Sequence, residues 1–295
     1  NDAVVRGNTV VKEGGGFWGN SGHLLSISDS MFHNNSAQFG GAIFGDGVDA
    51  DVSVDRSTFT GNAAQINGGA IAIEGGTLFI ADASFTGNSA SGNAPGLGGG
   101  AIFTGAANEI SNTDLFNNSV AMPMGNGGGI LVAASGTGTY FGGAIQGNSA
   151  GRAGGGLEIA GQITLDQGFI PFGDDVQLLV DGNAAGINGG GLHISGTGNV
   201  LIRRSTVSNN KAASEGGGLW NSAGGSLTVN DTTLTGNTAS GDGSDQGGGG
   251  IYSDGGALTL NNATISGNIA DGVSGSGGGI LNNGGALTAT DSTIR

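Results

Sequence analysis

Carboxylate pairs are the residues of this sequence that could carry acid–base chemistry. Asp174 and Asp175 are adjacent, in a stretch that also holds Phe169, Pro171 and Phe172. Two carboxylates about 6.5–9.5 Å apart can hydrolyse a glycosidic bond with inversion, one acting as the acid and the other as the base. Asp174 and Asp175 therefore offer a catalytic alternative to the interpretation that we prefer, a decorated surface loop without chemistry.

A second group of acidic residues could bind a hard cation. Asp46, Asp49 and Asp51 lie close together in the sequence, and Ca²⁺ is bound by several carboxylate and carbonyl oxygens. Their spacing follows neither the EF-hand loop nor the calcium-binding nonapeptide repeat. Ca²⁺ at Asp46, Asp49 and Asp51 is the one cofactor hypothesis that the sequence offers, and its competitor is an ordinary acidic turn.

Basic and imidazole side chains are too few and too scattered to predict a lyase or a zinc site. Arg203-Arg204 is the sole basic pair, and we interpret it as a solvated turn. His23, His33 and His193 fall in different parts of the chain without the spacing of metal ligands. We expect these histidines on the surface or in turns.

The charge of the chain excludes whole classes of partner. The 295 residues carry a net charge of −15 with only eight Lys plus Arg. Nucleic-acid binding needs clustered basic residues, and anionic membrane surfaces attract basic segments, so neither partner is expected. Cysteine is absent, and no apolar run reaches the roughly 18 residues of a transmembrane helix.

A repeat of 26 to 35 residues must position all of these candidates. One anchor of the repeat is an apolar residue followed two positions later by Gly-Asn or Asn-Asn, as in FTGN at 59–62. The other is Gly-Gly-(Ala/Gly)-(Ile/Leu), as in GGAI at 68–71. A period in this range indicates a repeat architecture. Nine asparagines end the first anchor in successive repeats: Asn35, Asn62, Asn88, Asn118, Asn148, Asn183, Asn210, Asn237 and Asn268.

One repeat, residues 227–251, shows three strand signals and no helix signal. Residues 227–229 and 232–235 alternate apolar and polar side chains, and residues 247–252 add a third short strand. We therefore predict an all-β fold, a right-handed single-stranded parallel β-helix of about ten rungs with three short strands per rung. The apolar anchors would point inward and the anchor asparagines would form a hydrogen-bonded ladder at a bend. The glycine pairs are expected where a side chain would obstruct the backbone.

These repeats resemble a known family. GGAI at 40–43 and 68–71, with FTGN at 59–62 and 85–88, is similar to the GGA(I/L/V) and FxxN repeats of chlamydial polymorphic outer-membrane proteins. The resemblance covers nearly the whole chain. It implies a parallel β-helix that is secreted or exposed at the cell surface, often with an adhesive or structural role.

A resemblance to pectin-cleaving β-helix hydrolases does not extend to their spacing. Those enzymes carry Asn-Thr-Asp and a paired Asp on neighbouring strands, and this chain has NTD at 112–114 besides Asp174-Asp175. Asp114 lies two anchor repeats before Asp174, which would separate the carboxylates by roughly 10 Å along the axis. The His-Gly and Arg-x-Lys elements of these enzymes are missing as well.

The two ends of the sequence both fall within a repeat. Solenoids need polar capping repeats at their ends, and neither end has one. We therefore expect residues 1–295 to be a single β-helix domain taken from a longer repeat array.

The predicted function is a non-catalytic extracellular rod, structural or adhesive, secreted or at the cell surface. Its partners would be a host or neighbouring-cell surface, a glycan, or copies of itself placed end to end. Binding is expected in loops that vary in length while the anchors do not. These loops are residues 91–97, 121–126, 167–175, 238–246 and 271–276. The alternatives are a carbohydrate-active enzyme, either a polysaccharide hydrolase or a lyase, on the same scaffold, and a fibre subunit that assembles end to end.

Overall fold

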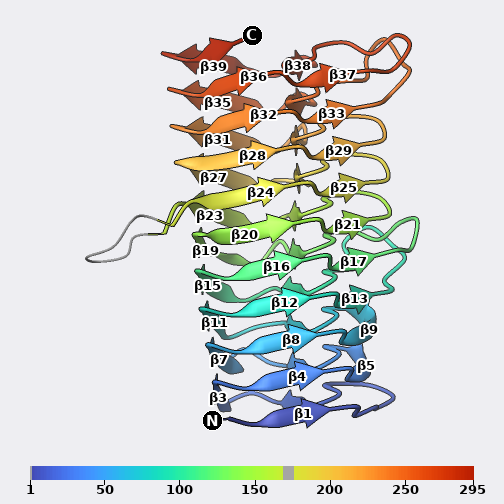
Figure 1. Cartoon of the computed structure of the whole chain (residues 1–295), viewed down its shortest axis with the longest axis vertical. Coiled ribbons are helices and arrows are strands. Elements are labelled where there is room, and N and C mark those ends of the chain that lie inside the picture. The colour runs from blue at the N-terminus through green and yellow to red at the C-terminus, as the bar shows by residue number, and fades with distance from the viewer. Residues whose placement is uncertain (1, 169–175) are drawn as a thin grey trace.

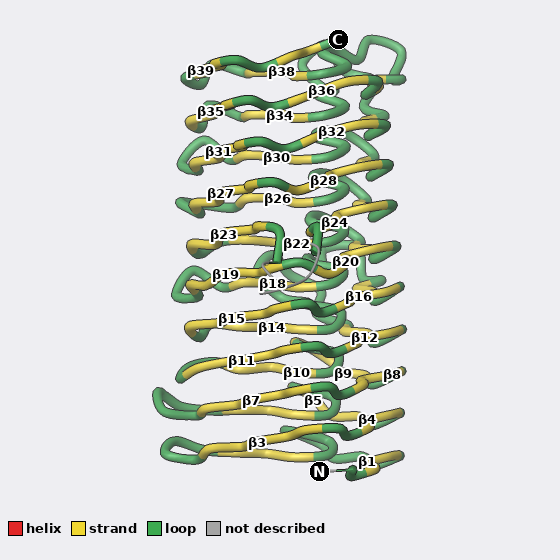
Figure 2. The backbone as a smooth tube through the Cα atoms, turned by 60° about the vertical axis from the view of Figure 1, so that its left-hand side comes forward, coloured by secondary structure: helices red, strands yellow, loops and turns green. Residues whose placement is uncertain are grey.

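A computed structural model describes residues 2–168 and 176–295, and there the chain winds as a stack of parallel β rungs (Figure 1). Four parallel sheets, which we call A to D, run along the stack. Within one rung the chain passes through sheets A, B, C and D in turn and then enters sheet A of the next rung. Figure 2 shows the rungs as separate levels, built from strands and loops alone in the described residues.

Each sheet takes one strand from each successive rung, except that the first rung has only isolated bridges at the position of sheet B. Sheet A contains β1 (Val4–Arg6), β4 (Met31–His33), β8 (Thr58–Thr60), β12 (Ser84–Thr86), β16 (Asp114–Phe116), β20 (Gly143–Gln146), β24 (Leu178–Asp181), β28 (Ser205–Ser208), β32 (Thr233–Thr235), β36 (Thr264–Ser266) and β40 (Thr293–Ile294). Sheet B contains β5 (Ser36–Phe39), β9 (Ala63–Asn67), β13 (Ser89–Ala90), β17 (Ser119–Val120), β21 (Ser149–Ala150), β25 (Ala184–Ala185), β29 (Lys211–Ala212), β33 (Thr238–Ala239) and β37 (Ile269–Ala270). Sheet C contains β2 (Phe17–Gly19), β6 (Ile43–Gly45), β10 (Ile71–Ile73), β14 (Ile102–Thr104), β18 (Ile130–Val132), β22 (Leu157–Ile159), β26 (Leu192–Ile194), β30 (Leu219–Asn221), β34 (Ile251–Ser253) and β38 (Ile280–Asn282). Sheet D contains β3 (Leu24–Ser28), β7 (Asp51–Asp55), β11 (Thr77–Ala81), β15 (Ala107–Ser111), β19 (Thr137–Phe141), β23 (Gln162–Asp166), β27 (Asn199–Arg203), β31 (Ser226–Asn230), β35 (Ala257–Asn261) and β39 (Leu287–Thr290).

The parallel β-solenoid is as predicted, but the prediction of three strands per rung is wrong, because the structure has four sheets. The missed strands are those of sheet B, and most of them have only two residues. One of these, β33, lies in the segment 238–246 that the sequence suggested was a variable loop. A two-residue strand is too short to show the alternation that predicts strands from sequence.

The main core is formed by inward-facing residues of sheets A, C and D. In-register pairing places like residues over like, for example Ile71 beside Ile102 in sheet C. In sheet A the rings of Phe32, Phe59 and Phe85 stack in line, with centroids 4.9 Å and 4.6 Å apart. Burying each such side chain contributes about 1.5–3 kcal/mol to stability.

The corner between sheets A and B explains why the first anchor is Gly-Asn or Asn-Asn. Its first residue has a positive φ in the nine anchors named above and also in Gly7-Asn8, for example 63° at Gly61 and 56° at Asn34. The left-handed conformation is strained for most L residues but open to glycine and tolerated by asparagine. The backbone of this corner therefore selects these two residue types.

The second residue of that corner is the anchor asparagine. The Nδ2 of Asn62 donates to the Oδ1 of Asn88 (3.0 Å) and to the backbone carbonyl of Phe32 (2.9 Å). Its Oδ1 accepts from both the Nδ2 and the backbone N–H of Asn35, each at 3.0 Å. All hydrogen-bonding positions of the buried amide are therefore used. The same side-chain bond links each neighbouring pair from Asn8 through Asn268.

The glycine pair at the entry to sheet C is required for two reasons. Its first residue has a positive φ, for example 64° at Gly127. Its second residue has no room for a side chain, since a Cβ on Gly128 would lie 2.2 Å from the carbonyl oxygen of Gly155 in the next rung. The prediction that side chains would obstruct the backbone here is confirmed.

Candidate functional site

The longest step between anchors includes the corner between sheets D and A. β23 ends at Asp166 and β24 begins at Leu178. Between them, the backbones of Gly168 and Val176 pair in antiparallel fashion, with N···O distances of 2.6 Å and 3.2 Å. Asp174 and Asp175, the catalytic candidates, lie outside the described residues. Their assignment therefore stays a prediction.

The base of this insertion is held by a buried carboxylate. Asp166 is 1% exposed, and its Oδ2 lies 2.8 Å from the Nη2 of Arg204 and 2.9 Å from the Nη2 of Arg203. The Nε of Arg204 donates to Oδ1 at 3.0 Å. Arg204 lies in a bend, and the side chains of Arg203 and Arg204 are 42% and 51% exposed, so the interpretation as a solvated turn fits; the sequence did not reveal the ion pairs with Asp166. A buried carboxylate needs charged partners, and the partners here are 37 and 38 residues distant in the sequence.

The polar residues of the NTD sequence at 112–114 are used in bonds between rungs. The Oδ1 of Asp114 accepts from the backbone N–H of Ala144 at 2.9 Å. Thr113 is buried, and its hydroxyl accepts a long hydrogen bond, 3.4 Å, from the backbone N–H of Ala83. The Nδ2 of Asn112 donates to Asp82. The motif is thus accounted for by the stacking of the solenoid.

The acidic group proposed for Ca²⁺ lies between sheets C and D. Asp46 and Asp49 are in the turn after β6, and Asp51 begins β7. The Oδ1 of Asp51 accepts from the backbone N–H (3.0 Å) and the hydroxyl (2.7 Å) of Thr77 in the next rung. Over residues 2–168 and 176–295, no three His, Asp or Glu side chains are grouped as a metal site. Ca²⁺ at this turn stays a prediction, which melting with and without EDTA can test.

The prediction that His193 lies on the surface or in a turn is wrong, because His193 lies in β26. It is 2% exposed, and so is Glu158, its in-register neighbour on β22. The Nδ1 of His193 lies 2.9 Å from the Oε2 of Glu158. The imidazole also stacks on Trp220, with ring centroids 4.3 Å apart and planes 13° apart. Burial of this ring on both sides leaves no room for a polymeric substrate, so we assign the pair a structural role.

The same column continues with two aromatic rings that have polar neighbours. Trp220 and Tyr252 stack with centroids 6.1 Å apart. The Nε1–H of Trp220 donates to the Oε2 of Glu215 at 3.1 Å. Burial raises the pKa of Glu215, although the bond from Trp220 works in the opposite direction. Burial likewise raises the pKa of Tyr252, whose hydroxyl accepts from Asn283 at 3.3 Å.

The sequence carries a signal for this column. The column consists of the residue that directly follows the Ile or Leu of the second anchor, on the face of sheet C opposite the main core. The first four are apolar, the next four carry polar atoms, and the last is apolar again. They are Phe44, Ala72, Phe103, Leu131, Glu158, His193, Trp220, Tyr252 and Leu281.

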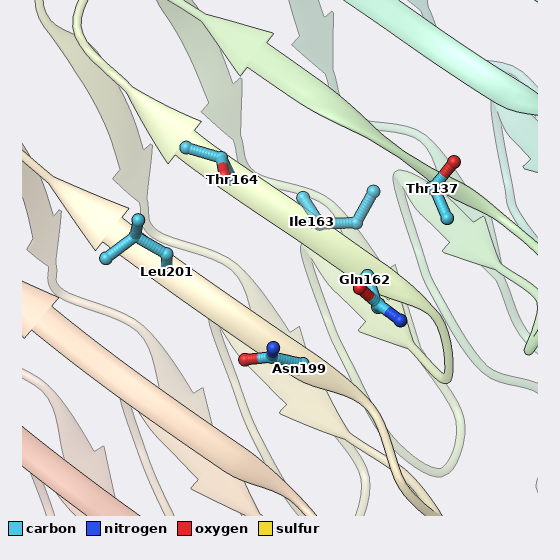
Figure 3. A pocket seen from close by; sticks show the side chains of 6 residues that line it. All are labelled: Thr137, Gln162, Ile163, Thr164, Asn199 and Leu201. Atoms are coloured by element: carbon cyan, nitrogen blue, oxygen red, sulfur yellow. The ribbon is translucent and has the colours of Figure 1, made fainter.

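Two hollows open on the outer face of sheet D. The first, of about 310 Å³, spans β19, β23 and β27 and is lined by Thr137, Gln162, Ile163, Thr164, Asn199 and Leu201 (Figure 3). The second, of about 380 Å³, spans β11 and β15 and is lined by Thr77, Leu78, Phe79, Ala107, Asn108 and Glu109. Neither is enclosed. Both lie on strands rather than on the variable loops.

The variable loops gather at two other corners. Segments 91–97, 121–126, 238–246 and 271–276 connect sheets B and C, as the loops on the right of Figure 1 show. The described ends of segment 167–175 lie between sheets D and A. The hollows and the loops that were predicted to bind are therefore on different parts of the surface.

One comparison with known proteins gives a match. Residues 56–74 match the family model of the Chlamydia polymorphic membrane protein repeat. This stretch runs from the corner before β8 through sheets A and B to the end of β10. No curated protein sequence and no solved structure matches the chain. The four-sheet stack shows a parallel β-helix of repeats, and the match shows that residues 56–74 resemble the repeat of this family.

The part of the chain that the structure describes has no long apolar helix of the type that crosses a membrane.

Proposed function

We propose that this chain is a non-catalytic extracellular rod that serves adhesion or structural support at a cell surface. The observation that carries the proposal is the use of its reactive side chains. Carboxylates that could have done chemistry bond one rung to another instead: Asp51 to Thr77, Asp114 to Ala144, and Asp166 to Arg204. Such side chains stabilise a stack and leave a scaffold without a reactive centre among the described residues.

The architecture supports a load-bearing or presenting role. Every rung is bonded to its neighbours through parallel strands and through the asparagine ladder. Because each rung contacts only the rungs beside it, the length of such a rod can change while its cross-section stays the same. The match of residues 56–74 to a repeat of membrane proteins supports the surface location.

Adhesion can be tested with beads that carry the purified chain. Beads coated at equal density with this chain or with serum albumin, another acidic protein, are allowed to settle on epithelial monolayers and exposed to rising shear. We expect the chain-coated beads to detach at a clearly higher shear. Equal detachment of the two kinds of bead on every surface tried would contradict an adhesive role.

A further inference from the structure

We propose that the outer face of sheet D binds an extended, uncharged polysaccharide chain that lies along the axis of the rod. This inference rests on the proposed adhesive function and names the class of partner. It places the binding surface on strands and not in the variable loops.

The first hollow has the side chains that hydroxyl groups require. Gln162 and Asn199 are exposed in-register neighbours that each present an amide with two donors and a carbonyl acceptor. Thr137 and Thr164 add hydroxyls on the same face, and Leu201 adds a half-buried apolar surface (Figure 3). The amides can hydrogen-bond the hydroxyl groups of a sugar ring, and the apolar patch beside them can contact its C–H face. This lining therefore suits a sugar ring.

The second hollow lies in line with the first. Its strands, β11 and β15, come directly before β19 in the order of sheet D. The two hollows therefore cover five consecutive strands, β11 to β27. Phe79, which is 40% exposed, supplies an aromatic surface in the second hollow. A ligand that contacts both must be long and run across the strands, which is the direction of the rod axis.

The charge of the chain and of the outer face of sheet D favours an uncharged ligand. In-register residues on the outer face of sheet D form two columns that contain no ionisable residue in the five strands from β19 to β35. The first column is Thr137, Gln162, Asn199, Ser226 and Ala257, and the second is Thr139, Thr164, Leu201, Thr228 and Thr259. The chain as a whole carries a charge of −15, and Glu109 lines the second hollow. A uronate polymer would be repelled, whereas an uncharged polymer would not.

The repeat of the rungs suits a repeating ligand. Rungs recur about every 4.8 Å, so the same kind of hydrogen-bonding group is presented at regular intervals. Each contact with a sugar hydroxyl is weak when water competes. Several contacts on one chain add up, because the second and later ones form within the same complex.

Native affinity electrophoresis tests the inference directly. The full chain is run in gels cast with hydroxyethyl cellulose, galactomannan or dextran, and in gels cast with polygalacturonate. We expect retardation by at least one uncharged polymer and none by polygalacturonate. The double variant Gln162→Ala/Asn199→Ala should bind roughly tenfold more weakly, as expected when two hydrogen bonds are lost.

A matched control is Gln65→Ala, which removes an exposed amide from β9 in sheet B. It should leave the retardation unchanged, and circular dichroism melts of all variants should coincide with that of the parent chain. Undiminished retardation of the double variant would overturn the site, and retardation by polygalacturonate in place of the uncharged polymers would overturn the ligand class. If no gel retards a chain whose beads adhere to cells, this inference fails while the proposed function stands. If the beads do not adhere either, the adhesive role fails together with this inference.

Discussion

At the scale of single residues, one asparagine per rung connects the rungs through the inside of a corner. Asn118 shows what one such residue does. Its Nδ2 donates to the carbonyl of Phe85 and to the Oδ1 of Asn148, and its Oδ1 accepts two bonds from Asn88. An unpaired buried donor costs about 1–3 kcal/mol, so the ladder stabilises mainly by leaving nothing unpaired.

Replacement of Asn118 by Ala should therefore be costly. The substitution leaves the backbone N–H and one Nδ2–H of Asn88 buried without the acceptor they now share. We expect the free energy of unfolding to fall by about 3 kcal/mol, from the penalties of unpaired buried groups. Urea denaturation measures this. Asn199→Ala, on an exposed strand position, is the matched control and should change stability by less than about 0.5 kcal/mol.

Glu215 makes stability depend on pH with a defined sign. Because burial raises its pKa in the folded chain above the ordinary 4.5, folding favours its neutral form. Its contribution to stability is most favourable below about pH 4.5 and is lost as the pH rises through the folded pKa. Glu215→Gln removes the charge and keeps an oxygen for the Trp220 Nε1–H.

We therefore expect the melting temperature of Glu215→Gln to equal that of the parent chain near pH 4 and to exceed it at pH 7. Differential scanning calorimetry over this range gives the difference between the two chains as a function of pH. A variant that melts below the parent at pH 7 would show that the hydrogen bond from Trp220 outweighs the cost of burial.

Pairs between neighbouring rungs were what sequence reasoning missed. His193 has no metal-ligand spacing to other histidines, but its partner is Glu158, one full rung away. The partner of Arg203 and Arg204 is Asp166, also one rung away. Both pairs become visible only when the register of successive rungs is known, because the rungs differ in length.

At the scale of elements, the corner between sheets D and A carries a clamp at the base of the insertion. Asp166 is buried, while the side chains of Arg203 and Arg204 are 42% and 51% exposed. The cost of breaking this group should depend on which side is removed. Loss of the arginines leaves a buried charge, and loss of the carboxylate leaves two guanidinium groups that water can reach.

The double variant Arg203→Met/Arg204→Asn should accordingly destabilise the chain more than Asp166→Asn does. Asn is chosen at position 204 because Arg204 has a φ of 47°, which asparagine tolerates. We expect a loss of about 3 kcal/mol for the double variant and a smaller loss for Asp166→Asn, both by urea denaturation. Lys211→Ala, an exposed cation on β29, controls for the loss of positive charge. The reverse order of the two losses would contradict the clamp.

Elements could be predicted from the sequence where each has enough residues to show a pattern. Strands of sheets A and D carry apolar residues beside polar ones, those of sheet C follow the glycine anchor, and the period of the anchors places all three in parallel register. The strands of sheet B could not be predicted, because a strand of two residues, such as Thr238–Ala239, shows no period. The hollows on sheet D could not be predicted, since they depend on which side chains of five strands stand next to one another.

At the scale of the whole molecule, the repeats account for a rod and leave its outer faces to differ from one another. The outer face of sheet D is uncharged over β19 to β35 in its first two columns, although the chain carries a charge of −15. The faces are rigid because parallel strands hold them in every rung. A rod of this kind can bind along its length without any catalytic residue.

The most direct test of this account measures binding and cleavage in one sample. The chain is incubated with hydroxyethyl cellulose, galactomannan and polygalacturonate while solution viscosity, reducing ends and unsaturated products are followed, and the bound fraction is determined by co-precipitation of the polymer. We predict retention on an uncharged polymer with constant viscosity and no new chain ends. A fall in viscosity with new ends, produced by the folded chain but not by the heat-unfolded chain, would contradict the assignment of a non-catalytic rod.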